Sequence, residues 1–143
     1  MTDPEELLTA LDGLVHAETQ VGDRGVDLTV AAVYEHDGPG RVDFGGGELE
    51  PASLTPHDRQ LRNPDDDYVW WHLEPGGYLF EYNERLVGDG AYRVQTRDAV
   101  RERGAFHPAL VVDSLGRMPL FVGDGGLRLK ENARISTLLP GPT

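Results

Sequence analysis

The chain has 143 residues, no cysteine and a formal net charge of −12 at pH 7. Its length fits a single domain, residues 1–143, with a buried core, and the lack of cysteine excludes disulfides and thiolate metal sites. So acidic a surface argues against nucleic-acid binding, which requires a basic footprint. No apolar run approaches the roughly 20 residues of a membrane span, and the N-terminus does not resemble a secretory signal. We therefore expect a cytoplasmic protein with no membrane or nucleic-acid partner.

The charged residues are unusual in type as well as in number. There are 25 acidic residues against 13 basic ones, and Lys130 is the only lysine among them. An acidic, arginine-over-lysine composition suits a salt-rich cytoplasm, where screening removes most of the self-repulsion. A GC-rich genome is the alternative explanation, because it favours the codons of arginine and aspartate. We interpret the composition as halophilic.

The N-terminal segment predicts the only helix, over residues 4–15. Apolar residues recur from Leu7 to Val15 at the spacing of one helical face. Asp3 can cap the helix, and Pro4 suits its first turn. We therefore expect residues 1–20 to form an N-terminal helical segment.

The remainder of the chain predicts short strands separated by turns. Eighteen glycines and ten prolines punctuate it, and this pattern indicates a sandwich or barrel. Residues 48–67 are the least regular stretch, and we interpret them as a surface excursion. Trp70 and Trp71 point to opposite faces of one strand, and we expect both in the core. The predicted strands are residues 26–34, 68–73, 78–82, 91–96, 109–113, 118–122 and 133–139.

Five short motifs resemble, in order, those of the dUTPase and dCTP-deaminase superfamily. They are Asp23–Leu28 (DRGVDL), Leu73–Leu79 (LEPGGYL) with the following Glu84, Arg97–Gly104 (RDAVRERG), Val111–Asp113 with Gly116, and Glu131–Leu138 (ENARISTL). Each motif alone is weak, but their order and spacing together are specific. The resemblance implies a mainly β fold, a distorted jelly roll of the β-clip barrel type with one N-terminal helix. It also implies a homotrimer with active sites between subunits.

The same resemblance implies a site for a pyrimidine deoxynucleoside triphosphate with Mg²⁺ as cofactor. Asp113 corresponds to the family's catalytic aspartate, the general base that deprotonates the attacking water. Asp27 is expected near hydrated magnesium, which prefers carboxylates together with substrate phosphates. Arg97, Arg101 and Arg134 are the expected nucleotide- and phosphate-binding residues, because a guanidinium fork matches phosphate oxygens.

The sequence departs from the family at the phosphate-binding motif. Two serines follow the family's arginine, whereas Asp98 and Ala99 follow Arg97 here. Ala99 donates no hydrogen bond, and a carboxylate beside a polyphosphate costs on the order of several kcal/mol. Pairing of Asp98 with Arg97 or Arg101 would neutralise both partners. In addition, Leu115 replaces an aromatic residue of the catalytic motif, and the family's glycine-rich C-terminal motif is absent from the sequence.

These observations leave two functions nearly level and a third behind them. The leading one is hydrolysis of dUTP to dUMP and pyrophosphate. The alternative is a catalytically degenerate relative that keeps the fold and acts as a nucleotide-binding or assembly module. Deamination of dCTP is less expected, because Phe121 stands where that reaction needs a glutamate, and the zinc-deaminase motifs are missing.

Overall fold

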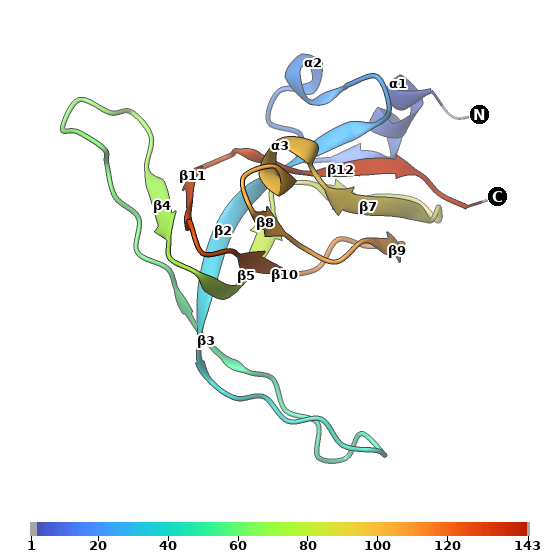
Figure 1. The fold of residues 1–143 in the computed structure, drawn as a ribbon. Helices are drawn as coiled ribbons and strands as arrows, with labels where there is room; N and C mark the ends of the chain where they lie inside the picture. The colour runs from blue at the N-terminus through green and yellow to red at the C-terminus, as the bar shows by residue number, and fades with distance from the viewer. Residues whose placement is uncertain (1–2, 143) are drawn as a thin grey trace.

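The structure, a computed structural model, describes residues 3–142, and strands dominate among them (Figure 1). The helical segments are α1 (Pro4–Leu7), a 3-10 turn η1 (Leu8–Ala10), α2 (Ala17–Gln20) and α3 (Asp98–Arg101). The strands are β1 (Leu11–Asp12), β2 (Val26–Gly38), β3 (Ser53–Pro56), β4 (Trp70–Leu73), β5 (Gly76–Tyr82), β6 (Arg85–Leu86), β7 (Tyr92–Thr96), β8 (Ala105–Phe106), β9 (Leu110–Val112), β10 (Met118–Val122), β11 (Leu127–Lys130) and β12 (Arg134–Pro140).

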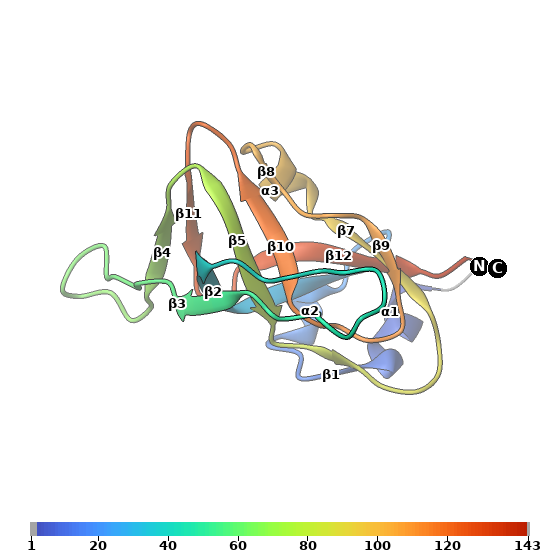
Figure 2. The ribbon, with the colours of Figure 1, turned by 90° about the horizontal axis from the view of Figure 1, so that it is seen from below.

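The long strand β2 joins the two halves of the main sheet. Its first residues pair antiparallel with β12, and the stretch Val30–Tyr34 pairs with β5. The strand order is β8-β10-β5-β2-β12-β7-β9, and β3 pairs with the far end of β2. A register shift in each of these pairings lets β2 bend between the halves, so the sheet curls on itself (Figures 1 and 2). The expected mainly β, barrel-like fold is thereby confirmed.

The core lies inside this curl and follows the alternation of side chains along the strands. Val26, Leu28 and Val30 of β2 are fully buried, as are Phe80 of β5 and Leu138 of β12. Each such side chain contributes about 1.5–3 kcal/mol by leaving water. Successive residues of a strand point to opposite faces. Because Val26 and Leu28 are buried, Asp27 between them points away from the core.

The N-terminal helix is shorter than the one predicted over residues 4–15. It begins at its predicted start, where Asp3 accepts a hydrogen bond from the backbone of the first turn, and it ends at Leu7. The chain then passes through a 3-10 turn into β1, where Leu11 pairs with Leu86 of β6. Isolated helices of this length are marginal, so tertiary pairing decides the conformation. Within residues 3–142, no helix has the length and apolar character needed to cross a membrane.

Beyond the barrel, β2 and β3 continue as a two-stranded arm, residues 36–54, which Figure 1 shows projecting from the body. Arg41 and Glu50 hold the arm together through paired backbone hydrogen bonds and an ion pair of 2.9 Å. The stretch 48–67, predicted as an irregular excursion, thus contains one side of this arm. The tip carries three exposed apolar side chains, Val42, Phe44 and Leu49.

The strands β4 and β11 form a separate two-stranded sheet beside the main one. Trp71 points inward from β4 and is 2% exposed. Trp70 points to the opposite face and is only partly buried, so the expectation that both tryptophans lie in the core is wrong for Trp70. The strand β11 was not predicted, because its alternating Leu-Arg-Leu-Lys pattern is short and lies next to a glycine-rich turn.

A buried polar chain links β5 and β12 to the loop that follows β8. His107 Nε2 lies 2.6 Å from the Ser136 hydroxyl, which lies 2.6 Å from the Tyr82 hydroxyl. The other ring nitrogen, Nδ1, lies 2.8 Å from the Pro108 carbonyl oxygen and must donate to it. Nε2 of the neutral ring therefore accepts from Ser136. Burial lowers the pKa of His107 and raises that of Tyr82.

The lowered pKa of His107 predicts an acid-side loss of stability. The unfolded chain takes up a proton near the ordinary histidine pKa of about 6.5, whereas the folded chain resists it. The stabilisation is therefore complete above that pH and is lost as the pH falls through and below it. We expect His107→Gln to flatten the dependence of the unfolding free energy on pH between about 7 and 5. The exposed His36, changed in the same way, should leave the slope as it is, and equal slopes in all three chains would contradict the prediction.

Candidate functional site

The start of β2, the middle of β12 and the start of α3 meet at one place on the barrel. The central strand β12 pairs on both sides: Thr137 lies opposite Asp27 of β2 and opposite Gln95 of β7. Arg97 directly follows β7, and its backbone N–H donates to the Ile135 carbonyl oxygen at 3.0 Å. Residues from the first, third and fifth of the sequence motifs are thereby brought together.

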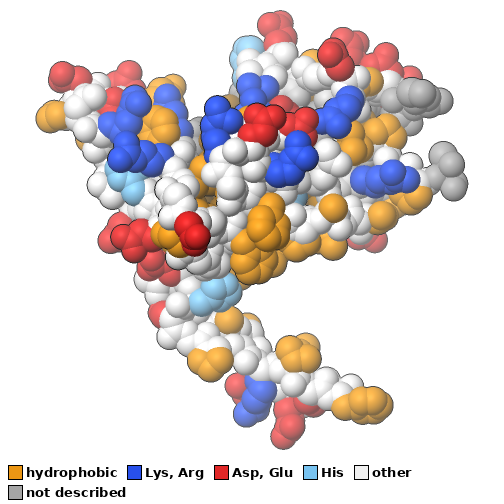
Figure 3. All heavy atoms as spheres, viewed as in Figure 1, with side chains coloured by type: hydrophobic (Ala, Val, Ile, Leu, Met, Phe, Trp, Pro, Cys, Tyr) orange, Lys and Arg blue, Asp and Glu red, His pale blue; other side chains and the backbone are white. Residues whose placement is uncertain are grey.

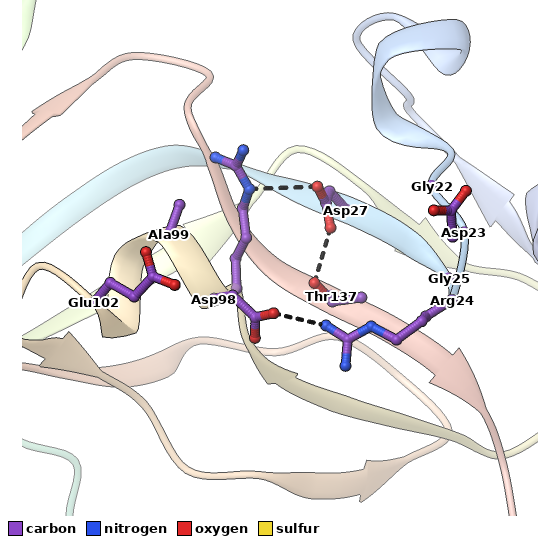
Figure 4. Close-up of a pocket in the computed structure, with 10 residues that line it drawn as sticks. Gly22, Asp23, Arg24, Gly25, Asp27, Asp98, Ala99, Glu102 and Thr137 are labelled. Carbon is purple, nitrogen blue, oxygen red and sulfur yellow. Dashed lines mark hydrogen bonds and ion pairs between the residues drawn. The ribbon is translucent and has the colours of Figure 1, made fainter.

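Asp27 is the centre of this cluster, and Figure 4 shows its carboxylate beside Thr137. Its Oδ1 accepts a hydrogen bond of 2.8 Å from the Thr137 hydroxyl, and its Oδ2 accepts one of 3.2 Å from Arg134 Nη1. Arg97 Nε forms an ion pair with the same Oδ2 at 3.4 Å. The three charged side chains are all partly buried. Both oxygens of the carboxylate are thus engaged by three donors from two other segments.

The cluster holds more positive than negative charge. Burial, followed by the neighbouring charge of Arg134, lowers the pKa of Arg97, while Asp27 opposes the shift. Both guanidinium groups stay charged, because arginine does not lose its proton in proteins. Two cations therefore share one carboxylate, and the remaining positive charge can attract an anion.

The cluster opens onto a hollow of about 430 Å³, a size typical of sites for small ligands. On one side stands the turn before β2, and on the other the first turn of α3 (Figure 4). Its lining residues are Gly22, Asp23, Arg24, Gly25, Asp27, Arg97, Asp98, Ala99, Glu102 and Thr137. Three of the five predicted site residues, Asp27, Arg97 and Arg134, lie in or directly against it.

Asp98 lies at the rim of this hollow between two arginines. Its carboxylate pairs with Arg24 Nη2 at 3.0 Å and with Arg101 Nη2 at 3.3 Å. Of the two pairings considered from the sequence, the one with Arg101 is present, while Arg97 turns to Asp27 instead. All three side chains of the Arg24–Asp98–Arg101 bridge are half exposed or more.

Asp113 lies apart from the cluster within one chain. It follows Val112, which pairs with Tyr92 at the beginning of β7, whereas Arg97 comes after the end of the same strand. Five residues of strand separate the two positions by about 17 Å, at roughly 3.4 Å per residue. Asp113 lines a different hollow together with Ala91. A single chain therefore does not bring the predicted base to the predicted phosphate-binding residues.

Besides Thr137, two residues that shape the site were not among those predicted to act there. Arg24 faces the hollow and pairs with Asp98, and Gly25 lets the turn pack against β12. A Cβ atom on Gly25 would collide with the Leu138 carbonyl oxygen. Both residues belong to the first motif, whose glycine was the available signal.

A buried carboxylate positions the turn and the first residues of β2. Glu84, 1% exposed, accepts hydrogen bonds from the Thr29 backbone N–H at 2.8 Å and from its hydroxyl at 2.5 Å. It also accepts one of 2.9 Å from Gln20 Nε2, which donates in addition to the Asp27 carbonyl oxygen. Gln20 Oε1 in turn accepts from the backbone N–H groups of Val15 and the next residue. Glu84, matched to the family only as a motif residue, thus connects the N-terminal segment to the strand that carries Asp27.

Comparison with known proteins agrees with the fold. A probable deoxyuridine 5′-triphosphate nucleotidohydrolase of Methanosarcina acetivorans is 33% identical over 136 residues, which cover 90% of this chain and 76% of the relative. Its counterpart in Archaeoglobus fulgidus is 32% identical over 132 residues, covering 87% and 74%. One of Halobacterium salinarum is 34% identical over 74 residues, covering 50% and 41%. No family model matches the chain.

The curled antiparallel sheet, whose longest strand begins near an aspartate paired with two arginines, is a mainly β barrel of the dUTPase type. With relatives this similar over most of its length, the chain belongs to the dUTPase-like superfamily.

Removal of the Glu84 carboxylate should destabilise the protein strongly. Glu84→Ala leaves the Thr29 N–H and one of the two amide hydrogens of Gln20 without an acceptor, at a cost of about 2–5 kcal/mol in unfolding free energy. Glu84→Gln keeps one acceptor and should cost less. Denaturant unfolding in concentrated salt measures both, with the exposed Glu102→Ala as a control expected to stay within about 0.5 kcal/mol of the parent. Equal losses in Glu84→Ala and in the control would show that the network contributes nothing.

Proposed function

We propose that the protein hydrolyses dUTP to dUMP and pyrophosphate at sites formed between copies of a homotrimer. The observation that supports this most directly is the cluster of Asp27, Arg97 and Arg134 beside a hollow of nucleotide size. The names of relatives that align over most of the chain agree with the reaction.

The triphosphate would enter the hollow towards the positive cluster. Arg97 and Arg134 have a combined charge that exceeds that of Asp27, so they attract the phosphates and orient them. Asp98 repels the phosphates, yet it is tied to Arg24 and Arg101 by exposed ion pairs. Pairs of this kind are worth about 0–1 kcal/mol, so a phosphate can displace the carboxylate and take over its arginines.

Magnesium fits this site only when it is bound to the phosphates of the substrate. The carboxylate of Asp27 already accepts from Thr137 and pairs with two arginines. Residues 3–142 offer no cluster of three metal-ligating side chains. Hydrated Mg²⁺ held by phosphates would receive a water-mediated contact from Asp27. The bound ion would neutralise charge on the phosphates.

Asp113 of a neighbouring copy would supply the general base. It lies too far from Asp27 in its own chain, so the site becomes complete only when a second copy presents its β9–β10 turn. The base accepts a proton from water as the water oxygen attacks the α-phosphorus. The bond from that phosphorus to the bridging oxygen breaks, and pyrophosphate leaves with the electron pair.

A mixing experiment tests both the reaction and the shared site. Asp113→Asn and Arg97→Gln chains should each lose pyrophosphate release from dUTP in Mg²⁺ and high salt. Reassembled together in equal amounts, they should recover about one quarter of the parent activity, because that fraction of sites combines an intact base with an intact arginine. Circular dichroism confirms that each variant is folded. Failure of the mixture to exceed either variant alone would contradict a site between copies.

Asp98 and Ala99 favour the second candidate, a binding or assembly protein without turnover. Bound dUTP raises the melting temperature of an enzyme and of a nucleotide-binding module alike, but only the enzyme releases pyrophosphate. If dUTP neither stabilises the protein nor turns over, both of these are wrong, and only the assembly module is left.

Replacement of Asp98 should improve the affinity for phosphate. Asp98→Ser removes the rim carboxylate and frees Arg24 and Arg101, and we expect the KM or Kd for dUTP to fall about tenfold, equivalent to ~1.4 kcal/mol. Glu102→Gln is the matched control, since it removes one negative charge from the same hollow without touching either arginine. If both variants had an equal effect, the gain would come from the loss of one negative charge and not from the release of Arg24 and Arg101.

A further inference from the structure

A second concentration of cationic and aromatic side chains lies on the outer face of the β4–β11 sheet, away from the hollow described above. In Figure 3 it is the blue, orange and pale-blue group at the upper left, over β4. We call it the basic–aromatic face. The register of the two strands places Trp70 opposite Lys130 and His72 opposite Arg128, with all four side chains on the outer side. Arg62 completes the face from the loop before β4.

Two of the three cations of this face, Arg62 and Lys130, lie over aromatic rings. The Arg62 guanidinium carbon lies 4.5 Å from the Trp70 ring centroid. Lys130 Nζ lies 4.5 Å from the ring of Tyr68 and 5.8 Å from that of Trp70. Ring contacts hold a cation in place without neutralising it. The positive charge of the face is therefore ordered and still available.

Only part of this positive charge is taken up by ion pairs among the described residues. Arg62 pairs with Asp66 at 3.5 Å, whereas Arg128 and Lys130 form no ion pair with any residue in the range 3–142. Acidic residues outnumber basic ones by 25 to 13 in the sequence, so neighbouring unpaired cations are unexpected. Residues two apart on a strand are separated by roughly 6.8 Å, close enough for one polyvalent anion to bridge them.

The same face holds the two side-chain nitrogens that are buried without a hydrogen-bond partner within the described part of the chain, Trp70 Nε1 and His72 Nε2. A buried polar group without a partner costs about 1–3 kcal/mol, and such groups are rare in native structures. The indole nitrogen is purely a donor, as are arginine and lysine. The face thus offers donors and positive charge, and its chemical complement is an anion rich in acceptor oxygens.

A hollow of about 460 Å³ adjoins the face and would orient such an anion. His72 and Arg128 of the face line it, as do Glu74 and Asp124 of the turns that follow β4 and precede β11. The two carboxylates repel negative charge. A ligand would therefore place its charged group towards Arg128 and Lys130 and its uncharged part towards the turns, where backbone of Gly125 and its neighbours forms the wall.

We propose that the basic–aromatic face binds a phosphorylated small molecule, a phosphate or diphosphate ester, at a site separate from the proposed dUTP site. The phosphate oxygens bridge Arg62, Lys130 and Arg128 and accept from the unpartnered indole N–H. The long side chains of Arg62 and Lys130 can move aside to admit the ligand. Extended nucleic acid is a poor fit, because the surrounding surface of a −12 protein repels a longer polyanion.

Titration calorimetry of the full chain with pyrophosphate, without magnesium, tests the site. Arg128→Glu should weaken binding at least tenfold. The matched control is Arg93→Glu, the same change at another exposed, unpaired arginine on a strand, and it should leave the affinity unchanged. Trp70→Phe keeps the ring, removes the indole N–H and should weaken binding about fivefold.

Two further binding measurements distinguish the possible outcomes. In the Arg97→Gln background, binding that depends on Arg128 should persist, because the face is independent of the proposed catalytic cluster. Binding that is lost with Arg97 and indifferent to Arg128 would overturn the proposal while supporting the dUTP site. Citrate should bind far more weakly than pyrophosphate, and equal Arg128-dependent binding would overturn the phosphate assignment. No measurable binding of pyrophosphate would overturn the site itself.

Discussion

The buried carboxylate of Glu84 is the interaction on which the candidate site depends. It satisfies both the backbone and the side chain of Thr29, and through Gln20 it fixes the N-terminal segment against β2. A carboxylate can be buried only when several donors surround it, so the segments that supply those donors cannot shift independently. Asp27 lies two residues from Thr29 on the same strand, and Gln20 also donates to its carbonyl oxygen. Asp27 is therefore held through its backbone carbonyl by Gln20 and through its carboxylate by Thr137 and the two arginines.

The charged side chains of the candidate site fall into two groups that differ in burial and in the strength of their ion pairs. The Asp27 cluster is partly buried, so its interactions are strong and its geometry is fixed. The bridge from Arg24 through Asp98 to Arg101 is exposed, so it is weak and easily exchanged. Asp98 therefore belongs to the exposed rim of the hollow, and the partly buried centre around Asp27 is formed without it.

The sequence was sufficient to predict the strands that alternate clearly and the residues that belong to ordered motifs. The seven predicted strands all correspond to strands of the structure, and Asp27, Arg97 and Arg134 meet as the motifs imply. The shortened N-terminal helix was not predictable, because the pairing of Leu11 with Leu86 joins segments more than seventy residues apart. The arm and β11 were missed for a related reason, since short polar strands are defined by their partners and not by their own pattern. The role of Arg24 depends on a similarly long-range contact with Asp98.

The double pairing of β2 has a consequence for how the protein opens. One strand provides the hydrogen-bonding partner of β12 along its first residues and of β5 along its middle. Neither half of the sheet can separate from β2 without exposing part of the common core, in which side chains from both halves are fully buried. Local opening should therefore be confined to the arm, while the two halves exchange their amide hydrogens as one cooperative unit. The residues that clasp Asp27 belong to that unit, so the site exists only while the whole barrel is closed.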